Sequence, residues 1–155
     1  MTQYTTPEEI AAEIATRIAQ IDGADGWITE IGTRIFHGRV QVDDDVVPCC
    51  SIVEGADQVQ TGPSQRMAMA HIKQQYALVA YLACDANSPN TAARQAIRDI
   101  KRAIFRTNGA PSKDWGGKVR SVNYQGRNIG PRADGKPLVM AVVEIEVEYA
   151  EDLAA

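Results

Sequence analysis

Isoleucines recur at helical spacing directly after the segment Thr6-Pro7-Glu8-Glu9. Thr6 and Glu9 stand at the positions of a capping box, and Pro7 suits the first position of a helix. The apolar side chains then fall on one face, as in an amphipathic helix of about four turns that ends near Asp22-Gly23. They are Ile10, Ile14, Ile18 and Ile21.

A second helical pattern follows the break at Asn87-Ser88-Pro89 and extends from Thr91 to Phe105. Its apolar face is formed by Ala93, Ile97, Ile100 and Ile104. Asn108-Gly109 is expected to close this helix, because glycine and asparagine are common just after a helix ends.

The stretch from Leu138 to Tyr149 alternates between apolar and polar residues, which predicts a long strand with one buried face. The expected inner face consists of Val139, Ala141, Val143, Ile145, Val147 and Tyr149. The expected outer face consists of Met140, Val142, Glu144, Glu146 and Glu148. Part of the stretch from Met67 to Cys84 is apolar at consecutive positions, which indicates a central strand buried on both faces.

Weaker patterns predict three more strands. They cover Arg34 to Val42 (interrupted by Gly38), Val46 to Glu54, and Val119 to Tyr124. The expected loops are Asp43-Asp44-Asp45, Gly55 to Ser64 and Gln125 to Pro137. The sequence therefore predicts one α+β domain, residues 1–155, in the order α-β-β-β-α-β-β. Two helices would pack on one face of a mainly antiparallel sheet, and the other face would be open to solvent or to a partner.

The charge and the apolar content exclude some classes of protein. The net charge of −4 argues against a domain whose main task is to bind nucleic-acid phosphates. No apolar run approaches the roughly 20 residues that cross a bilayer, and the first residues do not resemble a signal peptide. We therefore expect a protein that is made and kept in a cytoplasm, with its three cysteines as free buried thiols.

The sequence offers few candidates for chemistry, and we expect neither an enzyme nor a bound cofactor or metal. Cys49 and Cys50 are adjacent, so on a strand they point to opposite faces and do not readily share a metal. A catalytic pair of Cys50 or Cys84 with His71 stays open, although no local motif marks either thiol as activated. Asp43, Asp44 and Asp45 lack the spacing of a dedicated calcium loop, so a solvated acidic loop is favoured.

Two rows of charged residues have both a structural and a functional interpretation. Four basic residues form one outward stripe on the second helix: Arg94, Arg98, Lys101 and Arg102. The stripe is either a solvated helix face or a contact with an acidic surface of a partner or another copy of the chain. Glu144, Glu146 and Glu148 predict a solvated sheet face. In a ring assembly, the same row would line the opening and repel DNA phosphates.

The arrangement of these elements resembles a known family over nearly the full length. The capped N-terminal helix leads to Val46-Val47-Pro48-Cys49-Cys50-Ser51-Ile52-Val53-Glu54-Gly55. The long strand that contains Gln75-Tyr76-Ala77-Leu78-Val79-Ala80-Tyr81 precedes the second helix, and Val142 to Tyr149 closes the chain. This layout is similar to the small tail-terminator (tail-completion, minor tail protein U-like) proteins of long-tailed bacteriophages and prophages.

The resemblance implies a structural protein without catalytic residues. It implies a ring, commonly a hexamer, that caps the tail tube, stops its growth and joins the tail to the head connector. The implied partners are other copies of the chain, the tail tube protein and the connector protein, with at most passing contact with DNA and none with a membrane. The implied location is the virion tail or the head-tail junction. Two alternatives stay open: a ferredoxin-like domain that binds a ligand or a protein, and a small enzyme that uses Cys84 or His71.

Overall fold

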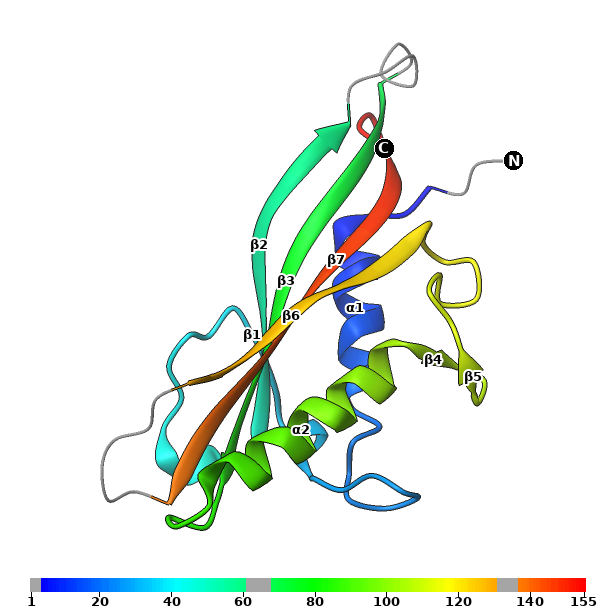
Figure 1. Cartoon of the computed structure of the whole chain (residues 1–155). Helices are drawn as coiled ribbons and strands as arrows, with labels where there is room; N and C mark the ends of the chain where they lie inside the picture. The colour runs from blue at the N-terminus through cyan, green and yellow to red at the C-terminus, as the bar shows by residue number, and fades with distance from the viewer. Residues whose placement is uncertain (1–3, 61–67, 131–136) are drawn as a thin grey trace.

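The computed structural model describes residues 4–60, 68–130 and 137–155, which form two helices and a five-stranded sheet. Helix α1 (Pro7–Ile18) and helix α2 (Pro89–Ile104) lie on the same side of the sheet (Figure 1). In spatial order, the strands are β1 (Ile35–His37), β2 (Cys49–Gln60), β3 (Met69–Ala83), β7 (Leu138–Asp152) and β6 (Ser121–Gly130). Of these strand pairs, β1–β2 is parallel and the other three are antiparallel. The predicted α+β class and element order are confirmed.

Strands β3 and β7 form the centre of the sheet and pair along their whole length. Leu78 stands opposite Val143 and Tyr76 opposite Ile145, and these four side chains are buried against the helices. The inner face predicted for β7 is buried at each of its six positions. The two isoleucine-lined helices therefore close one contiguous core, which excludes water from the helix side of the sheet.

Helix α1 begins as predicted and ends one turn early. The capping box is present, with the Glu9 amide donating to Thr6 Oγ1 (3.2 Å) and the Thr6 amide donating to Glu9 Oε2 (3.1 Å). The helix ends at Ile18, yet Ile21 is still fully buried because the chain folds back beneath the helix. There, the Gly32 amide donates to the Ile21 carbonyl, and a side chain at Gly32 would collide with the helix backbone.

The residues after α2 form a hairpin instead of a helix cap. Strands β4 (Arg106–Thr107) and β5 (Ala110–Pro111) pair across Asn108 and Gly109. Both turn residues have positive φ angles, 51° and 80°, as a tight two-residue hairpin turn requires. The sequence correctly predicted a left-handed backbone at Asn108-Gly109. It was wrong about the element, because these residues form the turn of a hairpin and not the end of α2. Among the described residues, no helix combines the length and apolar character needed to cross a membrane.

The predicted strand Arg34 to Val42 is reduced to three residues, because the chain leaves the sheet edge at Gly38 and crosses the outer face. Ser51 Oγ donates to the Arg39 carbonyl (2.6 Å), and the Tyr81 hydroxyl donates to the Val40 carbonyl (2.9 Å). One corner of the outer face is therefore covered, although the whole face was expected to be open.

Strands β2 and β6 extend beyond their predicted ends. Gly55 to Gln60 and Gln125 to Gly130, both expected in loops, continue the strands past a bulge. Their sequences are polar because these parts lie at the sheet edges, with little side-chain burial to impose alternation. Residues 61–64 and 131–136 of the two predicted loops lie outside the described residues, as does Met67, the predicted start of the next strand.

A buried arginine joins the two helices to the hairpin. Arg17 of α1 is 6% exposed, and its guanidinium donates to the Ala103 carbonyl (3.2 Å), the Arg106 carbonyl (2.7 Å) and Thr107 Oγ1 (3.0 Å). Trp115 stacks on this guanidinium and donates its indole N–H to the Ile104 carbonyl (2.8 Å). Carbonyl groups at the end of a helix lack partners within it, so these side chains cap α2.

We predict that Arg17→Met lowers the free energy of unfolding by about 3–5 kcal/mol, because the buried carbonyl groups lose charged donors. Chemical denaturation followed by circular dichroism measures the change. Arg94→Met is the matched control on the exposed surface of α2, with an expected change within about 0.5 kcal/mol. Equal effects of the two substitutions would contradict the capping role of Arg17.

Candidate functional site

The four basic side chains predicted to form one stripe on α2 point in two different directions. Arg94 and Arg98 are exposed, and the Lys101 ammonium lies 4.5 Å from the centre of the Tyr124 ring on β6. Arg102 turns the opposite way, where it stacks on Trp27 at 4.5 Å and donates to the Gly26 carbonyl (2.8 Å). Sequence spacing placed all four residues on one stripe, but internal contacts hold Arg102 away from the other three.

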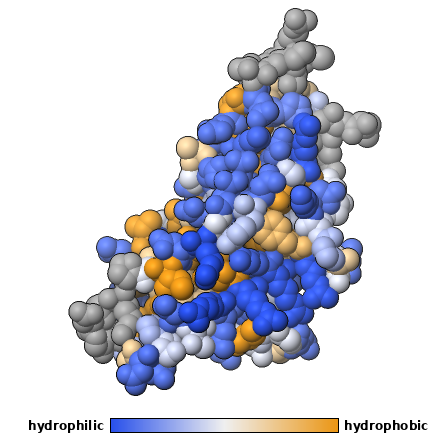
Figure 2. Space-filling view, in the orientation of Figure 1, coloured by the Kyte–Doolittle hydropathy of each residue, from blue (hydrophilic) through white to orange (hydrophobic). Residues whose placement is uncertain are grey.

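Strand β6 contributes a fourth basic side chain to the remaining three. Arg127 stands opposite Val143, on the helix side of the sheet, as Tyr124 does opposite Ile145. We call Arg94, Arg98, Lys101 and Arg127 the basic edge. Among the described residues of α2 and β6, Asp99 is the sole carboxylate, and it is buried. Strand β6 crosses in front of the other strands in Figure 1, and Figure 2 shows a mainly hydrophilic surface in the same view.

Asp99 points inward from α2 and attaches the segment before β1 to the helix. Its carboxylate accepts hydrogen bonds from the Ile28 amide (3.1 Å), the Thr29 amide (2.7 Å) and the Thr29 hydroxyl (2.8 Å). Sequence reasoning missed this role. The available signal was the position of Asp99, directly before Ile100 of the apolar helix face. A carboxylate buried there needs hydrogen-bond partners from another segment of the chain.

The three glutamates of β7 lie on the outer sheet face, as their alternation predicted, and two of them have partners. Glu146 accepts from Gln75 Nε2 (2.7 Å). Glu148 accepts from Ser121 Oγ (3.1 Å) and lies 3.8 Å from Arg120. Glu144 is exposed between Ala77 and Gly126, which are too small to cover it. The row is therefore a hydrated, internally bonded acidic strip.

The other half of the outer face is apolar. Val79 and Tyr81 of β3 stand opposite Val142 and Met140 of β7. The segment after β1 covers part of this half, which leaves Val142 and Met140 half-buried. Hydrophobic side chains also gather at the left of the view in Figure 2.

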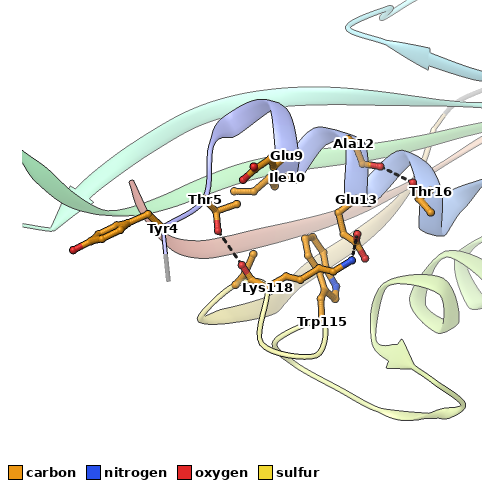
Figure 3. A pocket seen from close by; sticks show the side chains of 10 residues that line it. Tyr4, Thr5, Glu9, Ile10, Ala12, Glu13, Thr16, Trp115 and Lys118 are labelled. Carbon is orange, nitrogen blue, oxygen red and sulfur yellow. Dashed lines mark hydrogen bonds and ion pairs between the residues drawn. The ribbon is translucent and has the colours of Figure 1, made fainter. Parts of the chain in front are cut away.

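A groove of about 400 Å³ follows α1 on the side away from the sheet centre (Figure 3). Its walls are α1, the two residues Tyr4 and Thr5 before it, and the segment from Trp115 to Val119. Lys118 reaches across to Glu13, with Nζ 2.8 Å from the carboxylate. Burial raises the pKa of Glu13, but the hydrogen bond from Lys118 and the positive charges of Arg17 and Lys118 outweigh it, so the net shift is downward. The described residues lining this groove include no cysteine and no histidine.

The candidate catalytic pairs are not brought together. His71 and Cys84 stand 13 positions apart on or next to the extended strand β3, which at roughly 3.3 Å per residue separates them by about 40 Å. Cys50 pairs with Ala80, far along the strand from His71. A catalytic pairing of His71 with either thiol is therefore wrong.

Two of the thiols are shielded from solvent. Cys49 and Cys50 are fully buried and face opposite sides of β2. Burial, with a smaller contribution from Cys49, raises the pKa of Cys50 to about 12. In the part of the chain that the structure describes, no three His, Cys, Asp or Glu side chains are placed to hold a metal ion. Asp43, Asp44 and Asp45 accordingly lie exposed without converging on one point.

No protein-family model and no curated protein matches this chain. Among solved structures, one similar chain comes from the virion of the native gene transfer agent (GTA) particle. It has a TM-score of 0.51 and 13% sequence identity, and the match covers 90% of this chain and 96% of that chain. At this identity, the match shows a shared fold across nearly the whole of both chains.

We predict that only Cys84 reacts rapidly with a thiol reagent in the native protein, because it is half-buried whereas Cys49 and Cys50 are fully enclosed. Mass spectrometry after brief alkylation near neutral pH identifies the labelled site, and the Cys84→Ser variant should stay unlabelled. Rapid labelling of Cys50 in the folded state would contradict its placement in the core.

Proposed function

We propose that this chain is a structural protein of a phage-type virion, and that it acts as a tail terminator rather than as an enzyme. The observation that carries the proposal is the fold shared with a chain of a GTA virion, which spans nearly the full length of both proteins. The small-domain layout, with two helices on one face of the sheet, supports it. In this role, the protein caps the tail tube, ends its elongation and joins the tail to the head connector.

The proposed active form is a ring of identical copies, with a hexamer as the expected number. A closed ring requires heterologous contacts, in which one surface of each copy meets a different surface of the next. Arg94, Arg98 and Lys101 are the candidate residues on one side of that contact, since two are exposed and none forms an ion pair with a described residue. We assign Arg102 a supporting role, because it holds the segment around Trp27 against α2.

The proposed partners follow from this position in the particle. Besides other copies of the chain, they are the tail tube protein on one side of the ring and the connector protein on the other. Assembly would take place in the host cytoplasm, and the finished location would be the virion tail or the head-tail junction. Contact with DNA would be limited to its passage through the ring.

Glu144, Glu146 and Glu148 are proposed to face the opening of the ring. DNA phosphates repel a carboxylate strip, so a passing duplex would not adhere to it. The internal hydrogen bonds of Glu146 and Glu148 keep these side chains ordered, which supports a fixed acidic lining.

The second candidate function is a domain that binds a small ligand or a protein segment. The groove beside α1 favours it, because its volume lies within the range of ligand sites and its wall contains the large aromatic ring of Trp115. The molecular mass of the protein in solution distinguishes the two functions. A ring protein forms oligomers at high concentration, whereas a simple binding domain stays monomeric.

We predict that deleting the gene from the particle that encodes it yields tails of uncontrolled length that are not joined to heads. Electron microscopy of lysates measures the tail-length distribution, and expression of the wild-type chain from a plasmid should restore one length. Tails of normal length that carry heads in the deletion strain would overturn the proposed function.

We also predict that replacing Glu144, Glu146 and Glu148 with glutamine leaves assembly intact and lowers DNA delivery. Glutamine preserves the shape of each side chain and removes the charge that repels the duplex. The measurement compares DNA transfer per complete particle with that of wild-type particles. An unchanged transfer would remove the support for an acidic opening.

A further inference from the structure

The sheet has two unlike edges, with β1 and β2 on one side and β6 on the other. Strand β1 pairs only with the part of β2 from Cys50 to Ile52. From Glu54 to Gln60, β2 is exposed at every residue, and within the described chain its outer side has no strand partner. Such an edge presents unpaired backbone groups to any strand or side chain that approaches it.

The β2 edge is strongly acidic. Residues 40–60 contain five carboxylates and no lysine or arginine. Glu54 and Asp57 lie on the exposed half of β2, and Glu8 from α1 and Glu151 from β7 lie near them. Burial raises the pKa of Tyr149 to about 12, and the negative charges of these four carboxylates add to the effect. We call Glu8, Glu54, Asp57 and Glu151 the acidic edge.

The acidic edge and the basic edge cannot neutralise each other within one molecule. Strands β3 and β7 lie between β2 and β6, so at about 4.8 Å per strand the two edge strands are roughly 15 Å apart. The three ion pairs found among the described residues include no member of either edge. Within the described part of the chain, neither set of charges therefore has a counter-charge at ion-pair distance.

We propose that neighbouring copies meet by docking the acidic edge of one copy (Glu8, Glu54, Asp57, Glu151) on the basic edge of the next (Arg94, Arg98, Lys101, Arg127). This inference rests on the proposed ring and names the surfaces that form it. Opposite edges attract, whereas two acidic or two basic edges repel, so a symmetric dimer through like edges is disfavoured. A pair of copies still has one free edge of each sign, which allows the contact to repeat around a ring.

Two charge-reversal variants test this contact in the full-length chain. Variant A carries Arg94→Glu and Arg98→Glu, and variant B carries Glu54→Lys and Asp57→Lys. All four residues are exposed and none forms a side-chain hydrogen bond in the described structure, so the fold should be retained, which circular dichroism verifies. Each variant keeps one native edge: the acidic edge in A and the basic edge in B.

We expect A alone and B alone to be monomeric under conditions where the wild type forms oligomers. An equimolar mixture should form A–B complexes, because the intact edges of the two variants complement each other. Native mass spectrometry identifies the 1:1 stoichiometry, and sedimentation at about 0.1 M and about 1 M salt should show the complex weaken as screening increases. Variant C, with Arg106→Glu and Lys113→Glu, has the same charge change as A outside the basic edge and should assemble like the wild type.

The outcomes separate this contact from the proposed function. If A and B each assemble like the wild type, or if the mixture contains no A–B complex, the contact is wrong. A tail-terminator role would survive either result, because tail length in the deletion strain tests it without reference to this surface. If variant C loses assembly to the same extent as A, the effect is one of net charge and the proposed edge pairing is overturned.

Discussion

The buried guanidinium of Arg17 is the interaction on which the relative placement of the other elements depends. It extends from α1 and stacks against the Trp115 ring. It donates hydrogen bonds to carbonyl groups at the end of α2 and in the β4–β5 hairpin. A buried cation is costly unless all its donors find partners, so this geometry is fixed within narrow limits. Helix α2 cannot slide or rotate against α1 without breaking several charged hydrogen bonds at once.

Fixing α2 at its C-terminal end determines which of its side chains reach solvent. Asp99 holds the Thr29 segment on one flank, and Arg102 holds Trp27 on the same flank. The opposite flank faces β6, where Lys101 covers the Tyr124 ring and Arg127 extends the row. A helix with basic residues on several sides thus presents one basic edge, and its remaining cation, Arg102, serves the internal packing.

The sheet then separates the charges of an acidic protein into two opposite borders. Carboxylates gather on and near the exposed half of β2, and cations gather along α2 and β6. The apolar inner residues of β3, and of β7 as far as Tyr149, lie between them. A net charge of −4 alone would suggest a uniformly repulsive surface. Because the acidic and basic side chains are instead segregated, the two borders are complementary. This complementarity is the physical basis for repeated contact between identical copies.

The sequence by itself determined the elements in which apolar residues recur along one buried face: both helices, the strands β3 and β7, and the inner face from Val139 to Tyr149. The α+β class followed from these elements. The sequence missed the far halves of β2 and β6, because edge residues with little burial carry no alternating pattern. Only the tertiary structure decided the roles of Arg17, Asp99, Arg102 and Trp115. Arg17, Asp99 and Arg102 form hydrogen bonds with residues about 70 to 90 positions away in the chain, and Trp115 stacks on the distant Arg17, so no local spacing encodes these contacts.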